Sequence, residues 1–191
     1  MKLNKAEIIQ QVRNEIAKSN EQVKRLQQQP IEALRHRPRP EAWSALDCIA
    51  HMNLFYDDYL PRLEVAVQQA APGSNPTYAP GFFGKKMIAS LRPQQGERRM
   101  KVNTFKKMTP HTDGKPPEPV FAAFFQHHAH LEGLLAPAAS LNWDQAKVAS
   151  VIGPILRFKL GDCFRLLLAH TERHLLQAHE ALEDEQVSAQ K

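Results

Sequence analysis

Residues 43–70 read WSALDCIAHMNLFYDDYLPRLEVAVQQA, and this stretch carries the sharpest helix-start signal in the chain. Ser44 can accept a hydrogen bond at a helix N-terminus and Asp47, at the third helical position, can return one, which is a capping-box arrangement. Apolar residues then recur with helical spacing, so we expect a helix from Ser44 to about residue 70. Pro61 lies inside this helix and predicts either a kink near Asp58 or a break there.

Three further stretches have the apolar periodicity of helices. Residues 3–29 carry a single apolar seam, residues 119–135 have one broad apolar face, and residues 162–183 are apolar nearly all round. Asp162 is the candidate N-cap of the last helix. Residues 35–40 contain two prolines and are expected to be a connector.

A long crossover joins the second and third predicted helices. Residues 71–117 hold seven of the fourteen prolines and five of the eight glycines. Connections of this length are uncommon in compact domains and are usually functional or mobile. We expect one short helix over residues 82–91 and an extended segment over residues 101–110. With no convincing alternating strands, the sequence predicts an all-α fold, a four-helix bundle with a crossover between helices two and three, in one domain over residues 1–191.

The positive charge of the chain is concentrated in one segment. The 191 residues have a net charge of +5, but residues 85–107 hold eight Lys and Arg against Glu97 alone, a local charge of +7 that leaves −2 for the rest. The segment has one interleaved aromatic residue, Phe105, and no nucleic-acid-binding motif. We therefore interpret it as a solvated basic loop and expect no nucleic-acid partner.

The composition also indicates the cellular compartment of the protein. Two cysteines are too few for a disulfide framework, and the first residues lack the apolar run of a signal peptide. No stretch approaches the roughly 18 consecutive apolar residues of a membrane span. We expect a cytoplasmic protein with no membrane partner, in which Cys48 and Cys163 are buried free thiols too distant to bridge.

Two of the nine histidines have the spacing of metal ligands. His170 and His174 are four residues apart on the most apolar predicted helix, so both imidazoles project from one face. Such a pair can supply two ligands at about 2.0–2.1 Å from one ion. Gln177 continues the same stripe. Taken alone, the pair is equally compatible with hydrogen-bonded or surface histidines.

A third ligand has to come from another helix. His51 is the leading candidate because its neighbours are apolar, a setting in which an unpartnered imidazole is costly. His127, His128 and His130 are alternatives, and the position of His128 on the apolar face of its helix favours a core or pocket-lining role. Three histidines that lie in proline-rich loops or point away from the pair are excluded as ligands: His36, His111 and His179.

Both motifs resemble those of the DinB-like (damage-inducible) superfamily of bacterial proteins. Residues 43–51, WSALDCIAH, resemble its W-S-x-x-E/D-x-x-x-H signature, and residues 170–177, HTERHLLQ, resemble its closing H-x-x-x-H-x-x-Q. The resemblance covers nearly the whole chain and implies a helix bundle with a crossover between helices two and three. It also implies a divalent metal held by His51, His170 and His174.

The resemblance implies a metal more directly than a reaction. Family members include thiol-dependent transferases and isomerases that act with low-molecular-weight thiols, proteins described as metal-dependent hydrolases, and many without a known activity. Three imidazoles leave an open coordination position, where bound water or a thiol would lose its proton near neutral pH. Zn and Ni are the preferred ions, with Fe, Cu and Mn as alternatives.

We therefore expect a metal-dependent hydrolase or thiol transferase that acts on a small molecule. A low-molecular-weight thiol is one candidate substrate. We also expect the protein to form a homodimer. The alternative is a non-catalytic metal-binding or stress-response bundle.

Several other residues are candidate helpers at the site. Gln177 could orient a ligand or a bound water, or could pack at the helix edge. Asp47 could reach the metal region, although capping already explains it. Asp58 is a candidate pocket acid or a surface residue, Cys48 is an alternative fourth ligand, and Trp43 is expected to anchor the core at the edge of the bundle.

Overall fold

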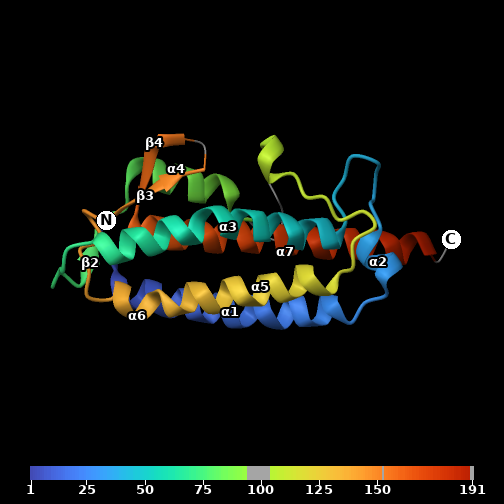
Figure 1. Cartoon of the computed structure of the whole chain (residues 1–191), viewed down its shortest axis with the longest axis horizontal. Coiled ribbons are helices and arrows are strands. Elements are labelled where there is room, and N and C mark those ends of the chain that lie inside the picture. The colour runs from blue at the N-terminus through green and yellow to red at the C-terminus, as the bar shows by residue number, and fades with distance from the viewer. Residues whose placement is uncertain (94–103, 152, 190–191) are drawn as a thin grey trace.

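The computed structural model describes residues 1–93, 104–151 and 153–189, and within these ranges the chain is mainly helical, which confirms the all-α class. Long helices in these ranges are α1 (Lys5–Gln27), α3 (Ala45–Gln69), α5 (Glu118–Gly133) and α7 (Leu160–Ala189). Helix α3 packs against α5 and α7, and α1 packs against the same two helices (Figure 1). Their apolar faces enclose a common hydrophobic core.

Helix α3 begins where its sequence predicts. The Ser44 hydroxyl accepts a hydrogen bond from the Asp47 backbone N–H, and the Asp47 carboxylate accepts one from the Ser44 N–H, both at 3.1 Å. The capping box is therefore confirmed. The helix then continues through Pro61 to its end, so the alternative of a break near Asp58 is wrong.

Helix α7 begins earlier than predicted, at Leu160, directly after a strand. Asp162 is not its N-cap. The Asp162 side chain is fully buried and accepts hydrogen bonds from the Gly81 N–H at 2.7 Å and the Tyr78 hydroxyl at 3.2 Å. A Cβ at Gly84 would lie 2.6 Å from the same carboxylate, so glycine is needed at this close approach. Asp162 thus holds the crossover against α7.

The crossover between α3 and α5 contains short elements instead of one continuous loop. They are β2 (Thr77–Tyr78), α4 (Phe82–Leu91) and the 3-10 helix η1 (Lys106–Met108). The predicted short helix over residues 82–91 is confirmed, and it lies along α7 on the side away from α1 and α5 (Figure 1). Of the segment predicted to be extended, residues 101–110, the described part starts at Thr104 and includes η1.

The predicted basic loop is only partly a loop. Lys85 and Lys86 lie on α4 with exposed side chains, and Arg92, just after that helix, forms an ion pair of 3.5 Å with Glu172 of α7. Three further basic residues of the segment fall in residues 94–103, outside the described ranges. In the described part, the charges therefore lie on or just after α4, which contacts α7, and on η1, which contains Lys106 and Lys107.

The expectation that the chain has no strands is wrong. β3 (Lys147–Ser150) and β4 (Gly153–Lys159) form an antiparallel hairpin that leads directly into α7, and β1 (Leu3–Asn4) pairs with β2. The hairpin is fastened to α3 by Arg62, whose guanidinium donates to the backbone carbonyl of Ser150 at 2.8 Å. Two short helices complete the described elements: α2 (Ile31–Arg35) and α6 (Leu135–Ala138).

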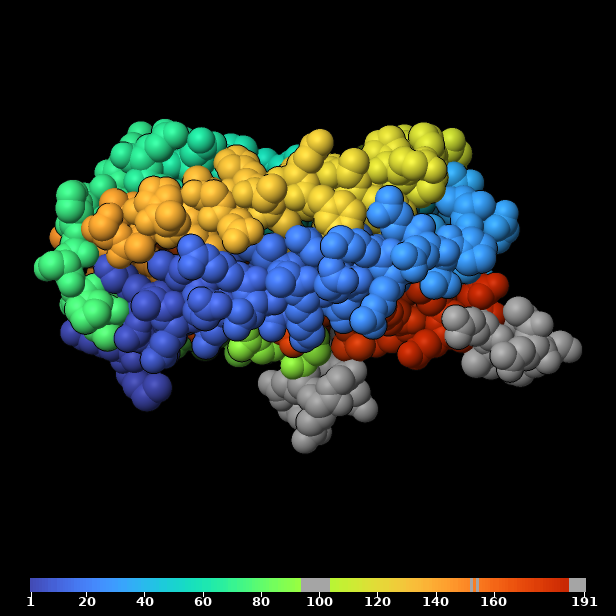
Figure 2. All heavy atoms as spheres, turned by 90° about the horizontal axis from the view of Figure 1, so that it is seen from below, coloured from blue at the N-terminus to red at the C-terminus, as the bar shows by residue number. Residues whose placement is uncertain are grey.

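The molecule therefore has two unlike faces. Figure 2 shows one of them, where α1 and α5 run side by side and cover the core. The other face carries α4 and the β3–β4 hairpin above α3 and α7 (Figure 1). Among the residues described, none of the helices combines the length and the apolar character that crossing a bilayer requires.

Candidate metal centre

The three histidines favoured by the sequence meet between α3 and α7. His51 lies on α3, two turns after its capped start, and His170 and His174 lie one turn apart on α7. One nitrogen of each ring can be chosen so that all three atoms lie within 4.8 Å of one another, and all three side chains are buried. The structure thus brings together residues separated by more than one hundred positions in the chain.

Hydrogen bonds orient two of the three rings. His51 Nδ1 lies 2.7 Å from the backbone carbonyl oxygen of Met108, and His174 Nδ1 lies 3.1 Å from the Gln177 Oε1. Because a carbonyl oxygen only accepts, each Nδ1 carries the proton and donates it. In this tautomer the Nε2 atoms of His51 and His174 carry the lone pairs that could bind a metal, and the hydrogen bonds fix the ring orientations.

The spacing of the nitrogens fits a common ion. His51 Nε2 and His170 Nε2 lie 3.1 Å apart. Two imidazole nitrogens on a tetrahedral ion, each at 2.0–2.1 Å from it, are separated by about 3.3 Å. The cluster therefore has the donor type of a divalent transition-metal site, and its His51–His170 pair has the matching spacing.

Burial keeps the candidate ligands in the form that can bind a metal. Desolvation lowers the pKa of His51 to about 4, a shift only partly opposed by its hydrogen bond to Met108. Burial also holds the pKa of His170 well below its usual value, and His174 and His51 lower it further. At neutral pH both rings are uncharged, which is the state required of a histidine ligand.

Aromatic rings flank the histidines. Phe55, one turn after His51 on α3, stacks on His170 with a centroid separation of 3.7 Å and an interplanar angle of 8°. Trp43 lies beside His51 and His174, with centroids 4.5 and 5.7 Å away. Trp43 is therefore more than an edge anchor of the core, because its half-buried ring contacts two of the candidate ligands.

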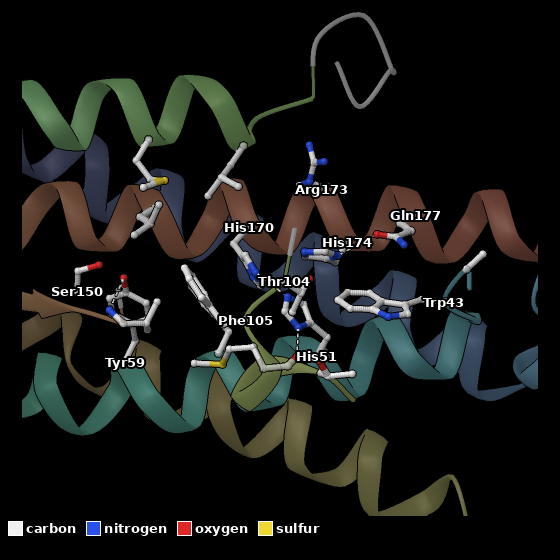
Figure 3. Close-up of a pocket in the computed structure, with 18 of the residues that line it drawn as sticks. Trp43, His51, Tyr59, Thr104, Phe105, Ser150, His170, Arg173, His174 and Gln177 are labelled. Atoms are coloured by element: carbon white, nitrogen blue, oxygen red, sulfur yellow. Dashed lines mark hydrogen bonds between the residues drawn. The ribbon is translucent and has the colours of Figure 1, made fainter. Parts of the chain in front are cut away.

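A cavity of about 840 Å³ lies next to the cluster, and all three histidines line it (Figure 3). Its volume is in the range of small-molecule sites. The other lining residues come from α3, α4, α7, the hairpin and the segments before α3 and around η1. They are Arg39, Glu41, Ala42, Trp43, Phe55, Tyr59, Met87, Leu91, Thr104, Phe105, Met108, Thr109, Ser150, Val151, Phe158, Leu166, Arg173 and Gln177.

His128 does not line this cavity. It is 1% exposed in the core, where its Nδ1 lies 2.7 Å from the Asn20 side-chain oxygen and its Nε2 lies 3.0 Å from the Tyr56 hydroxyl. The Tyr56 hydroxyl is also 2.7 Å from the Thr171 hydroxyl. His128 is therefore the centre of a buried polar network that joins α1, α3, α5 and α7.

Asp47 is also placed away from the cavity lining. Its carboxylate accepts hydrogen bonds from Arg37 Nε at 2.9 Å and Thr112 Oγ1 at 2.5 Å, besides the bond from Ser44. Burial alone would raise the pKa of Asp47, but these hydrogen bonds outweigh it and hold the pKa below its usual value. These hydrogen bonds explain how the buried Asp47 carboxylate stays charged at the start of α3.

The other candidates lie outside the histidine cluster. Asp58 forms an ion pair with Arg62 at 2.5 Å and is absent from the cavity lining described above. Among the described residues, the cluster of possible metal ligands at this site does not include Cys48, and Cys48 and Cys163 are both buried without a disulfide between them. The alternative histidines pair with acidic residues of α3: His127 with Asp57 at 3.3 Å and His130 with Glu64 at 3.4 Å.

Three contributors to the site were not predicted from the sequence. Phe55 follows His51 by four residues, and this helical spacing could have placed it beside the candidate ligands. Arg173 lines the cavity although only 5% of it is exposed. The Met108 contribution is a backbone carbonyl, for which side-chain chemistry offers no signal.

Replacing Gln177 by leucine is expected to weaken metal binding about 10- to 100-fold, because His174 loses the acceptor that fixes its tautomer and orientation. Competition with a chromogenic chelator measures this change. Gln177→Glu keeps an acceptor oxygen and should retain most of the affinity. Gln68→Leu, on the exposed surface of α3, is the matched control, and equal affinity in all four proteins would contradict the orienting role.

Comparison with known proteins agrees with this geometry. The family model described as the DinB superfamily matches residues 16–178, a range that includes all three histidines and Gln177. Neither the curated proteins nor the solved structures gave a significant match. The match spans most of the chain, and we conclude that the protein belongs to the DinB superfamily.

Proposed function

We propose that the protein is a metal-dependent enzyme in which a divalent transition metal, held by His51, His170 and His174, activates water or a thiol for hydrolysis or thiol-dependent transfer. One observation carries the proposal: the three buried imidazoles converge at the wall of a small-molecule-sized cavity. Structural metal sites are closed by four protein ligands, whereas catalytic sites keep one position open.

The donor set restricts the choice of ion. Three imidazole nitrogens suit Zn or Ni, with Fe, Cu and Mn as weaker alternatives. When bound, the ion supplies an open coordination position at which water or a thiol is deprotonated near neutral pH.

The chain itself prepares the site for this chemistry. Met108 and Gln177 hold His51 and His174 in the tautomer that presents Nε2. The rings of Phe55 and Trp43 cover the imidazoles and limit the access of bulk water. Arg173 lies between the two α7 ligands in sequence and lines the cavity, so its positive charge favours a substrate with an anionic group.

The test uses the protein loaded with cobalt(II). We expect enhanced water proton relaxation, and on addition of mercaptoethanol a thiolate-to-cobalt charge-transfer band in the near-ultraviolet. His51→Ala, treated in the same way, should show neither signal. Both signals depend on an open coordination position, which a closed structural site lacks.

The opposite result has a definite meaning. Stoichiometric metal with no exchangeable water and no response to the thiol would overturn the proposal. It would instead support a non-catalytic bundle in which the metal only stabilises the fold.

A further inference from the structure

The cavity extends along α3 and α7 well beyond the histidines. On α3, His51, Phe55 and Tyr59 recur every four residues and therefore share one side of the helix. Tyr59 lies eight residues from His51, about 12 Å along the helix axis at 1.5 Å per residue. Figure 3 shows Tyr59 and Ser150 at one end of the cavity, Trp43 and Gln177 at the other, and the three histidines between them.

Helix α7 lines the same part of the cavity and runs antiparallel to α3. Its residue His170 stacks on Phe55, and Leu166, one turn earlier, continues the wall toward Tyr59. Beyond the stacked pair of His170 and Phe55, the α7 wall is thus aliphatic and the α3 wall aromatic.

Helix α4 forms the cover of this region. Gly84 lies against Asp162, and Arg92 forms an ion pair with Glu172, so α4 and α7 run in the same direction. Met87 lies between those two contacts and therefore faces the Leu166 level of α7, where it lines the cavity.

The hairpin residues Val151 and Phe158 complete the enclosure. We call this region the apolar arm and define it by six residues: Phe55, Tyr59, Met87, Val151, Phe158 and Leu166.

The polar atoms at the far end of the apolar arm have partners within the protein. The Tyr59 hydroxyl accepts a hydrogen bond from the Val151 N–H at 3.4 Å and interacts with the Ser150 side chain. The Ser150 carbonyl accepts one from Arg62. A ligand in the arm therefore meets ring faces and alkyl groups. Among the described lining residues, the charged ones belong to the segment just before Trp43 or adjoin His174: Arg39, Glu41 and Arg173.

We propose that the apolar arm binds an aliphatic or aromatic group of the substrate, so that the substrate is a small amphiphile whose reactive head meets the histidine cluster and whose tail lies along Phe55 and Tyr59. The assignment of the head rests on the proposed function. The assignment of the tail rests only on the shape and chemistry of the arm.

The test measures tail binding in the metal-free protein. A homologous series of linear alcohols, from methanol to decanol, is titrated against a bound fluorescent anilinonaphthalene sulfonate. Each methylene that enters the arm should tighten binding about fourfold. The gain should stop at the chain length that fills the arm.

Variants of the arm should move that limit in opposite directions. Val151→Phe narrows the arm and should end the gain at a shorter chain, whereas Met87→Ala, at a half-buried position, widens it and should extend the gain. Val65→Phe adds the same atoms on the exposed surface of α3, where the side chain is 47% exposed, and should leave the limit unchanged. Circular dichroism confirms that each variant is folded.

Two results would overturn the proposal: affinity that does not depend on chain length, or one limit shared by all four proteins. Because no metal and no turnover enter this experiment, its outcome is separate from that of the cobalt test. A shifting limit together with a closed metal site would retain the arm and reject the proposed chemistry. A limit that does not shift, together with an open metal site, would retain the proposed chemistry and reject the amphiphilic substrate.

Discussion

The His170→Ala protein is expected to fold but to bind no stoichiometric divalent transition metal. Its Nε2 lies 3.1 Å from that of His51, so its removal leaves only two of the three convergent nitrogens. The loss of a hydrogen-bond partner behind a ligand costs roughly 10- to 100-fold in affinity, and the loss of the ligand itself should exceed this. Elemental analysis and chelator competition measure the change.

His179→Ala is the matched control for this experiment. His179 lies on the same helix but outside the histidine cluster, so this protein should retain its metal. If His170→Ala keeps a full equivalent of metal, the ligand set described above is incorrect. Far-ultraviolet circular dichroism establishes that both variants keep their helical content.

The metal-free protein is expected to lose stability on acidification, with His128 as a major source. Burial, with a contribution from His127, lowers the pKa of His128 to about 3 in the folded protein, against about 6.5 in the unfolded chain. Between these values the unfolded chain binds the additional proton, so the free energy of unfolding falls as the pH falls below about 6.5. From pH 7 to pH 5 this group alone should remove about 2 kcal/mol.

His128→Gln should reduce this pH dependence, because glutamine can hydrogen-bond to Asn20 and Tyr56 but does not titrate. Urea unfolding at the two pH values gives the loss for each protein. We expect the variant to lose about 2 kcal/mol less than the wild type. Buried histidines common to both proteins, including His51 and His170, cancel in this difference. Equal losses in the two proteins would show that His128 does not carry the effect.

The sequence predicted those parts of the structure that depend on local patterns. The capping box at Ser44 is a short-range signal, and it located the start of α3 correctly. His170 and His174 share a face because of helical geometry alone. The assignment of His51 needed further information. Its apolar setting did not exclude other histidines as the third ligand, and the motif resemblance decided among them.

Contacts between distant segments account for what the sequence did not predict. Asp162 has the form of an N-cap, but its carboxylate is used by Gly81 and Tyr78 of the crossover, about eighty residues earlier in the chain. The strands of the β3–β4 hairpin are short and lie on helices, so they lack the long alternation by which strands are recognised. The bond from His51 to the carbonyl of Met108 depends on tertiary structure and has no signature in residue type.

The hairpin is attached in a way that bears on how this protein could acquire new substrates. The candidate metal ligands are on long helices of the core, whereas Val151 and Phe158 are on a two-stranded hairpin between α6 and α7. Changes of length or sequence in that hairpin can reshape the tail-binding wall without displacing the imidazoles. Two of the six residues of the proposed arm are thus on a segment that carries none of the candidate ligands, and a library confined to residues 147–158 is the natural starting point for directed evolution of specificity.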